Sequence, residues 1–267
     1  MPEALTKSTA SVRFAELAAP PGWQAIDFIS DLHLRAADPA TFRVWQAYLT
    51  ATPADAVFIL GDLFEVWVGD DAAAVNASFD QQCAEVLAAA GARLALHLMH
   101  GNRDFLIGQS LASKCHASLL ADPTVLTFAE RRWLLSHGDA LCLDDTDYQQ
   151  FRKLVRSQAW QQAFLAQPLA DRQAVAKDMR SQSEDRKRLG TGTGYGDIDP
   201  QAARAWLQKA HSSSLIHGHT HRPADHSLGD GLGRTVLSDW DAQASPPRAE
   251  VLRLGVAGLQ RIDLLAT

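Results

Sequence analysis

The sequence has no long hydrophobic run, few cysteines and no excess of basic residues. No apolar stretch approaches the ~18 residues that a membrane-spanning helix needs. The first 20 residues contain Glu3 and Glu16, and they lack the basic start and apolar centre of a secretory signal. The three cysteines have no C-x-x-C spacing, which argues against a disulfide framework and fits a reducing compartment. These absences predict a soluble, cytoplasmic protein.

The charge and the size of the chain limit its partners and its architecture. A formal net charge of −6 and a pI near 5.9 argue against a general nucleic-acid binder, which usually has a basic surface. With 46% hydrophobic residues over 267 positions, the chain can bury the core of one large domain, with or without an insertion. We expect no nucleic-acid partner and a monomeric protein.

Five short motifs of metal-ligating residue types each follow a hydrophobic run that is typical of a buried β-strand. The runs span 26–30, 57–60, 94–99, 133–136 and 215–216. The motifs that follow them are Asp31-Leu-His33, Gly61-Asp62, Gly101-Asn102-Arg103-Asp104, His137-Gly138-Asp139 and His217-Gly218-His219. Because α/β folds build their sites at the carboxyl ends of strands, we expect these side chains to gather at one edge.

The number and kind of these side chains make two adjacent metal positions plausible, since four ligands would suffice for one structural ion. Two divalent ions bridged by one carboxylate activate a water and stabilise the phosphoryl oxygens in an in-line displacement. Asp62 is the predicted bridge. The other predicted ligands are Asp31, His33 and His219 for one ion, and Asn102, His137 and His217 for the other. The two-residue spacing in Asp31-Leu-His33 and in His217-Gly-His219 would put both side chains of each pair on the same side of an extended segment.

The rest of the chain predicts an α/β body with a helical insertion. We expect helices at 40–51 and 76–90, and strands at 235–240 and 249–265, the last pair turned around 255–258. We divide the chain into an extension at 1–24, loosely ordered over 1–20, a core at 25–146 and 200–267, and an insertion at 147–199. An insertion of this kind is the usual form of a lid or specificity element.

The insertion combines an apolar stripe with a highly charged helix. The stripe consists of Tyr148, Phe151, Leu154, Val155, Trp160, Phe164 and Leu165. It either packs as ordinary core or forms a groove for acyl chains. After Pro168, a polar helix is expected over 170–189, with a basic cluster of Arg180, Arg186, Lys187 and Arg188. That cluster is either a solvated face or a binding surface for phosphate or a membrane.

Longer strings surround the five motifs and occur in a fixed order. They are Ser30-Asp-Leu-His-Leu34, Gly61-Asp-Leu-Phe-Glu-Val-Trp-Val-Gly-Asp-Asp71, His100-Gly-Asn-Arg-Asp104, Ser136-His-Gly-Asp139 and Gly218-His-Thr-His-Arg-Pro223, with Leu143-Asp-Asp145 and Tyr148-x-x-Phe-Arg152. Over 27–239 the chain resembles the calcineurin-like metallophosphoesterase superfamily. Within it, the chain resembles the UDP-2,3-diacylglucosamine diphosphatases of lipid A synthesis.

The resemblance implies a fold, a cofactor and a reaction. The fold is a four-layer α/β/β/α sandwich whose helical insertion caps the site, and the cofactor is two divalent metal ions of the Mn²⁺ type. Water would attack the α-phosphorus of a lipid-linked UDP-sugar, UDP-2,3-diacylglucosamine, and release UMP and 2,3-diacylglucosamine 1-phosphate. The resemblance also implies a cytoplasmic protein that lies peripherally on the inner membrane surface.

The resemblance further assigns roles to individual residues. Asp62, Asn102 and Arg103 would be catalytic, and an arginine at position 103 suits a diphosphate. The residues expected to contact substrate are Asn102, Arg103, Asp145, Ser183, Lys187 and His217. Related enzymes carry asparagine and lysine downstream of the serine, in an S-x-x-x-N-x-x-K arrangement, where this chain has Lys187 and Gly190. The basic cluster around Ser183 would supply the positive charge that is missing there.

The remaining polar residues have simpler interpretations. No role is assigned to His97, His100, His116, His211, His221 and His226, because a lone histidine is usually a core or surface residue. Asp104 and Asp139 are expected to orient ligands or backbone rather than to bind metal. Asp70 and Asp71 are expected to cap the helix that follows them.

Two alternative functions stay open at the level of sequence. One is a metallophosphoesterase of another specificity, such as a nucleotide phosphodiesterase, which the aromatic insertion disfavours. The other is a scaffold that keeps the fold without activity. The presence of all seven predicted ligands disfavours the scaffold.

Overall fold

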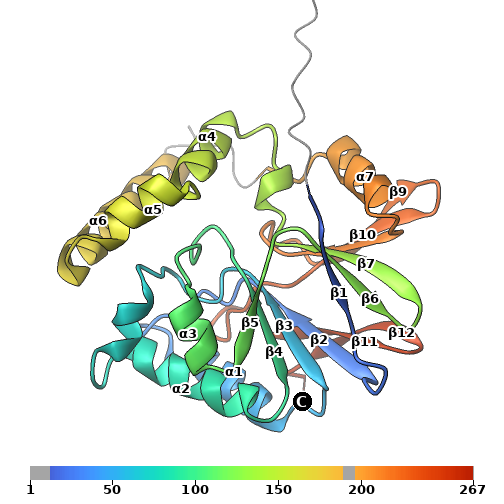
Figure 1. Ribbon diagram of the computed structural model, residues 1–267, viewed down its shortest axis with the longest axis horizontal. Helices are drawn as coiled ribbons and strands as arrows, with labels where there is room; N and C mark the ends of the chain where they lie inside the picture. Colours follow the sequence, from blue (N-terminus) through green and yellow to red (C-terminus); the bar gives the residue numbers. More distant parts are fainter. Residues whose placement is uncertain (1–12, 189–195, 267) are drawn as a thin grey trace, which may run out of the picture.

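The computed structural model describes residues 13–188 and 196–266, and the side chains of 180–188 lie outside this description. Its strands form two six-stranded sheets (Figure 1). The first sheet has the order β1 (Ala15–Ala18), β6 (Thr124–Phe128), β7 (Arg131–Ser136), β8 (Ser214–His217), β10 (Leu232–Val236) and β9 (Ala224–Gly229). The second has the order β12 (Gly258–Asp263), β11 (Glu250–Gly255), β2 (Ala25–Ile29), β3 (Ala56–Leu60), β4 (Ala95–Met99) and β5 (Ala117–Leu120).

The five strands predicted to precede ligand motifs are confirmed, and they are neighbours. β2, β3 and β4 pair in parallel in the second sheet, and β7 pairs in parallel with β8 in the first. All five residues of β3 are buried, as is expected of a parallel strand that is covered on both faces. The parallel pairing brings the carboxyl ends of these strands, and the loops that follow them, to the same side of each sheet.

Three apolar clusters define four layers. Phe28, Phe58, Leu135 and Ile216 belong to a cluster that joins the facing sides of the two sheets. The outer side of the second sheet packs against α1 (Pro39–Ala51), α2 (Phe79–Gly91) and α3 (Gln109–Lys114). The outer side of the first sheet packs against α7 (Pro200–Lys209). The predicted α/β/β/α sandwich is therefore confirmed.

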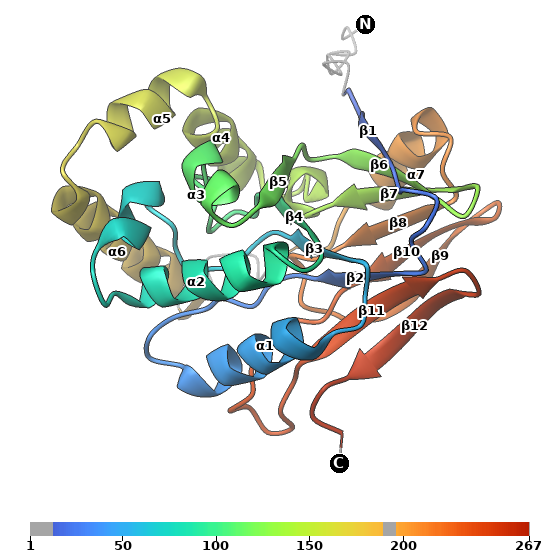
Figure 2. The same cartoon turned by 60° about the horizontal axis from the view of Figure 1, so that its bottom comes forward.

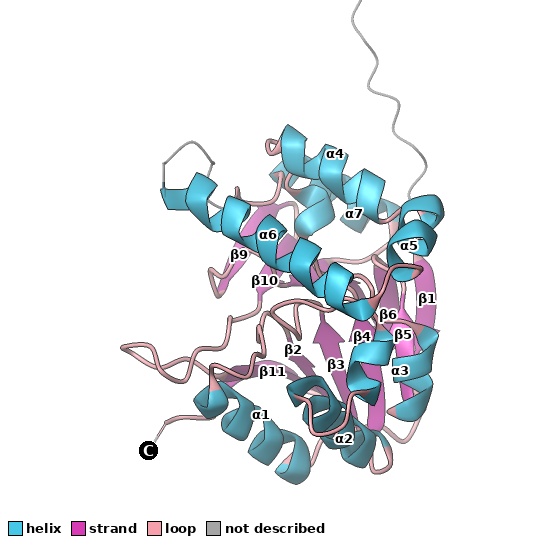
Figure 3. Ribbon diagram, turned by 90° about the vertical axis from the view of Figure 1, so that its left-hand side faces the viewer, coloured by secondary structure: helices cyan, strands magenta, loops and turns pink. Residues whose placement is uncertain are grey.

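The described part of the insertion contains three helices, which stand together beside the sheets (Figure 2). They are α4 (Thr146–Val155), α5 (Gln158–Leu165) and α6 (Leu169–Arg188). The buried Arg172 of α6 pairs with Asp71 and donates to the carbonyl of Val68 at 2.5 Å, which ties this helix to the body. In Figure 3, α6 runs obliquely across the view, with α4 above it and α1 and α2 below it. Among the described residues, no helix combines the length and the hydropathy needed to cross a membrane.

The prediction of one continuous apolar stripe in the insertion is wrong. The chain leaves α4 at Arg156, and the Ser157 side chain caps a new helix, so the stripe is divided between two axes. Leu154 and Leu165 are 56% and 42% exposed, whereas Phe164 is buried. The charged helix predicted over 170–189 is α6, but Ser183, Lys187 and the rest of the basic cluster lie outside the described side chains.

Other boundaries also differ from the predictions. The extension predicted to be loosely ordered through residue 20 contains β1, which pairs in parallel with β6, so that prediction is wrong for 15–18. The strand predicted at 235–240 ends at Val236. The short strands β5, β6 and β9 and the helices α3 and α7 were not predicted, although Asp199 followed by Pro200 is a typical signal for the start of a helix.

Candidate metal centre

The loops of the site hold several residues in the left-handed backbone region, which is uncommon for residues other than glycine. Asp31, His33 and Asp62 have φ values of 55°, 47° and 53°. His219 and His221 have φ values of 68° and 53°. Such conformations are kept where the surrounding structure enforces them, and they occur frequently at functional sites. Each of these loops therefore turns sharply where a strand ends and directs its polar side chain inward.

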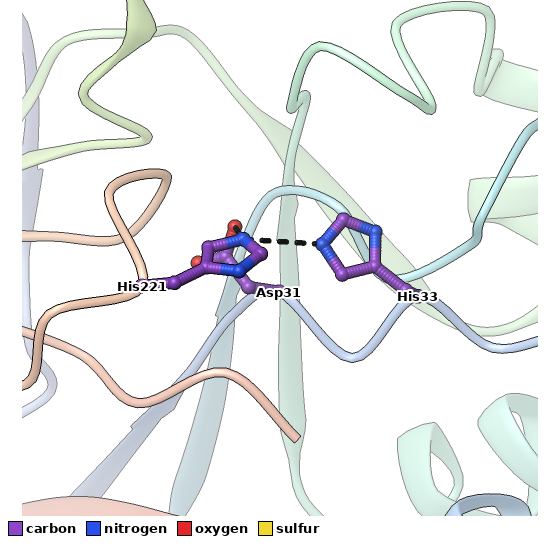
Figure 4. A group of neighbouring side chains, drawn as sticks. All are labelled: Asp31, His33 and His221. Carbon is purple, nitrogen blue, oxygen red and sulfur yellow. Dashed lines mark hydrogen bonds and ion pairs between the residues drawn. The ribbon is translucent and has the colours of Figure 1, made fainter. Parts of the chain in front are cut away.

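The first group of donors consists of Asp31, His33 and His221, whose ligand atoms lie within 4.8 Å of one another (Figure 4). His221 Nε2 lies 3.3 Å from Asp31 Oδ1 and 3.3 Å from His33 Nε2. Asp31 is fully buried, and its Oδ1 accepts no hydrogen bond from a described residue. A buried carboxylate oxygen that faces two imidazoles fits a divalent cation.

The second group of donors consists of Asn102, His137 and His219. His137 Nε2 and His219 Nδ1 lie 3.0 Å and 2.9 Å from the same oxygen, Asn102 Oδ1. The Leu60 carbonyl lies 2.9 Å from His137 Nδ1, so that nitrogen can donate its proton to the carbonyl and leave Nε2 as the ligand. This group supplies two imidazoles and one amide oxygen to a second position.

Asp62 lies between the two groups. Its Oδ2 is 3.9 Å from His33 Nε2, and its Oδ1 is 3.8 Å from His137 Nε2. Asp31, Asp62 and His137 also each place one ligand atom within 4.8 Å of the others, which is close enough to share an ion. One carboxylate that faces both groups has the geometry required of a bridge between two cations.

The donor groups differ from the predicted ligand sets, which placed His219 with Asp31 and His33, and His217 with Asn102 and His137. His217 is the last residue of β8 and is fully buried, with its Nδ1 2.9 Å from the Gly218 carbonyl. His219 joins Asn102 rather than the first group, and His221, to which no role was assigned, takes the place predicted for it. An extended segment was expected here, and the chain instead turns at His219 and His221, which both have positive φ.

No feature of spacing could have distinguished these histidines. His217, His219 and His221 alternate along the chain, so the string contains two pairs with the same separation. The structure extends β8 through His217, one residue beyond the predicted run, and so places that side chain in the sheet rather than in the loop. The role predicted for His217 as a substrate contact is likewise not supported, because its ring is fully buried.

Two glycines leave space that the donors occupy. A Cβ at Gly101 would lie 2.1 Å from Asp62 Oδ1, and a Cβ at Gly218 would lie 2.3 Å from Asp31 Oδ2. Both distances are far below van der Waals contact, so neither position tolerates a side chain without displacing a carboxylate. The glycines of the motifs thus allow the loops to approach the donors closely.

The electrostatics of the site suit a cation. Burial raises the pKa of Asp62 to about 7; His137 opposes this shift, and Asp104 and Asp31 add to it. Burial lowers the pKa of His33 and of His219 to about 3, so both rings are neutral near pH 7 and can offer a lone pair. A divalent ion would favour the ionised form of Asp62, and the neutral imidazoles are ready to bind it.

Carboxylates around the site hold its loops, partly as predicted. Asp104 is fully buried and accepts from the backbone N–H groups of Asp62, Leu63 and Gly101 at 3.3, 2.8 and 2.8 Å, so it orients backbone as expected. The prediction that Asp70 caps the following helix is wrong. Asp70 accepts from the N–H groups of Gly108 and Leu111 and so caps α3, a helix 38 residues further along the chain.

The structure shows the contacts of only some of the residues that were predicted to bind substrate. The guanidinium of Arg103 lies 3.5 Å from Glu65, and its backbone N–H donates to Asp62 Oδ1 at 2.8 Å. Asp145 caps α4 by accepting from the Tyr148 N–H at 3.0 Å. Ser183 and Lys187 belong to the part of α6 whose side chains are outside the description.

Comparison with known proteins adds a family and named relatives. The family model described as calcineurin-like phosphoesterase matches residues 25–223. The UDP-2,3-diacylglucosamine hydrolase of Chromobacterium violaceum is 46% identical over 226 residues, which cover 81% of this chain and 90% of that protein. Proteins of the same name from Aromatoleum aromaticum and Bordetella pertussis are 45% and 42% identical and cover 81% and 88% of this chain, with 89% and 93% of their own lengths covered.

Proposed function

The chain belongs to the calcineurin-like phosphoesterase family and, within it, to the UDP-2,3-diacylglucosamine hydrolases, and we propose that it hydrolyses the diphosphate of UDP-2,3-diacylglucosamine. Water attacks the α-phosphorus, and the products are UMP and 2,3-diacylglucosamine 1-phosphate, an intermediate of lipid A synthesis. The observation that carries this proposal is 46% identity over 81% of the chain to a hydrolase of that name. The substrate is therefore a UDP-sugar that carries acyl chains, and the enzyme is a metal-dependent diphosphatase.

The proposed cofactor is a pair of divalent ions, Mn²⁺ by preference. The ligands at the first position are Asp31, His33, Asp62 and His221, and those at the second are Asp62, Asn102, His137 and His219. Mixed imidazole and oxygen donors admit Mn²⁺, Fe, Zn²⁺ or Co²⁺, and the family resemblance favours Mn²⁺ among them. When bound, such ions supply Lewis-acid stabilisation of the phosphoryl oxygens and lower the pKa of an attacking water.

Residues of the chain then bind the diphosphate and exclude water. Asn102 and Arg103 follow one another in the loop after β4, so the amide NH2 of one and the guanidinium of the other can donate to the same phosphoryl group. The guanidinium of Arg103 is oriented by Glu65, and a guanidinium binds phosphate oxygens in a bidentate manner. Arg103 therefore offsets the charge that builds up on the diphosphate as the bond to the leaving group breaks.

The insertion is proposed to act as the lid over the acylated sugar. Leu154, Leu165 and Val175 lie on its three helices and expose 56%, 42% and 38% of their surface. Exposed apolar side chains on all three helices of the insertion suit contact with acyl chains or with the lipid surface that holds them. Asp145, Ser183 and Lys187 would contact the glucosamine from α4 and α6. We propose accordingly that the protein is a monomer on the cytoplasmic side of the inner membrane.

The test measures UMP release from UDP-2,3-diacylglucosamine by the Mn²⁺-loaded protein, beside Asp62→Ala and the exposed-site control His211→Ala. We expect turnover in the parent and in the control, and a loss of several orders of magnitude in the bridge variant. An intact substrate, together with hydrolysis of a generic aryl phosphodiester, would retain the metal centre and refute the substrate. No hydrolysis of either compound would refute the activity itself.

A further inference from the structure

The buried carboxylate of Asp139 lies two residues beyond His137 and receives its partners from the insertion. Its Oδ2 accepts from the Tyr148 hydroxyl at 2.5 Å and from Arg152 Nε at 2.8 Å, and Arg156 lies 3.7 Å away. Its Oδ1 accepts no hydrogen bond from a described residue. The compensation of this fully buried charge therefore comes chiefly from one helix, α4 and its C-terminal residue.

The three side chains lie on one face of that helix. Positions 148, 152 and 156 are each four residues apart, which aligns them along a single stripe of an α-helix. Gln149 adds a further contact, because its amide donates to the backbone carbonyl of Asp139 at 2.7 Å. The sequence pattern places Tyr148 in an apolar stripe, but its hydroxyl is the group that donates to Asp139. We call Tyr148, Arg152 and Arg156 the polar face of α4.

The polar face contacts one donor of the second group, His219, and the chain next to the other two. Arg156 donates to the Gly101 carbonyl at 2.9 Å, next to Asn102 in the chain. The Tyr148 ring stacks on His219 with ring centroids 6.1 Å apart and an interplanar angle of 26°. Asp139 follows His137 after a single glycine, Gly138, whose φ of 112° makes the connection a tight turn.

The first group is supported by different elements. His33 Nδ1 lies 3.8 Å from Glu65, in the loop after β3. His221 Nδ1 lies 3.9 Å from Asp239, in the segment after β10, and Arg248 holds that carboxylate at 2.8 Å. Asp62 is common to both halves and Asp31 accepts from the His219 N–H, but the remaining partners of the two halves are different.

We infer that the polar face of α4 positions the second metal position, through Asp139 and the loops of Asn102 and His219, and so couples the insertion to the metal centre. Tyr148, Arg152 and Arg156 are positioning residues that act through the donors. The inference rests on the proposed metal centre, and it adds that the two positions depend unequally on the insertion. Groups behind metal ligands fix ligand orientation, and their loss typically costs about 10–100-fold in metal affinity.

The experiment titrates Mn²⁺ into metal-free protein and resolves the two binding steps. The variants are Arg152→Ala, which removes the cation that is hydrogen-bonded to Asp139, and Tyr148→Phe, which keeps the ring and removes one hydrogen bond. Lys153→Ala is the matched control, because it removes one positive charge from an exposed site on the same helix. We expect one of the two binding steps to weaken about 10–100-fold in Arg152→Ala and less in Tyr148→Phe, while the other step matches that of the parent.

The possible outcomes separate this inference from the proposed function. Equal weakening of both steps, no change in either variant, or the same change in Lys153→Ala would overturn it, as would a parent that binds a single ion. If Arg152→Ala fails to fold, Tyr148→Phe alone decides, since it removes only a hydroxyl. The titration uses no nucleotide substrate, so a parent that binds two ions without releasing UMP would refute the proposed substrate and leave this test intact.

Discussion

Replacement of His221 by alanine should release one metal ion, whereas replacement of His217 should cost only stability. His221 Nε2 lies 3.3 Å from both Asp31 and His33, so its loss removes one of the four proposed donors of the first position. Loss of a group that orients a metal ligand typically lowers metal affinity about 10–100-fold, and loss of the ligand itself should lower the affinity further. We therefore expect the affinity of one ion to fall by at least about 100-fold.

The effect of His217→Ala has a different origin. The ring is fully buried at the end of β8, so its removal leaves a cavity and should cost about 2–4 kcal/mol of unfolding free energy, as other large-to-small core substitutions do. For a chain of this size that cost corresponds to a fall in Tm of roughly 4–16 °C, at about 2–4 °C per kcal/mol. Metal affinity should be retained at temperatures well below the transition.

The assay combines metal titration with thermal unfolding, and the exposed His211→Ala serves as the control. The two variants should separate, with weakened binding of one ion in His221→Ala and a lowered Tm in His217→Ala. The reverse result, with metal lost in His217→Ala and kept in His221→Ala, would show that the predicted ligand pair was right. It would also refute the assignment of donors from the turning loop.

Three further predictions concern the loops and one ion pair. Gly101→Ala should abolish UMP release, because its Cβ would lie 2.1 Å from a buried carboxylate oxygen, whereas Gly22→Ala, with nothing within 4 Å, should match the parent. Arg103→Ala should lower kcat by about 10²–10³-fold with metal content unchanged on elemental analysis; loss of metal would instead make it a support of the centre. The hydrogen bond from Arg234 lowers the pKa of Asp197 to about 2, below its ordinary 3.8, so the pair stabilises the fold above pH 3.8 and this contribution is lost as pH falls through 2. Denaturant unfolding should therefore show Asp197→Asn less stable than the parent at pH 7, with the difference shrinking below pH 4; a constant difference would contradict the pairing.

Much of the site was predictable because its information is local. A parallel strand that is covered on both faces must be a hydrophobic run, and a site at its carboxyl end must follow within a few residues. Asp31, His33, Asp62, Asn102 and His137 were found in this way, and the structure gathers them around one centre. The layer order was likewise expected from the family that the strings resemble, and the sheets confirm it.

Other features depend on contacts that spacing does not encode. Asp70 caps a helix 38 residues away, and Tyr148 turns its hydroxyl to Asp139 although its helix reads as apolar there. β1 is a four-residue strand whose partner, β6, lies more than 100 positions further along the chain. Side-chain periodicity describes one element at a time, so it cannot report a partner that folding brings from elsewhere.

By itself, the sequence determined the five strands that precede the motifs, the order of the motifs and the donor chemistry of a metal centre, because each follows from residue types within a short segment. Only the tertiary structure decided which histidines face that centre. His217, His219 and His221 share one spacing, and the choice among them depends on where β8 ends and how the loop turns at positive φ. Those backbone angles are enforced by packing from loops distant in sequence, such as Asp31, whose carboxylate accepts from the His219 N–H.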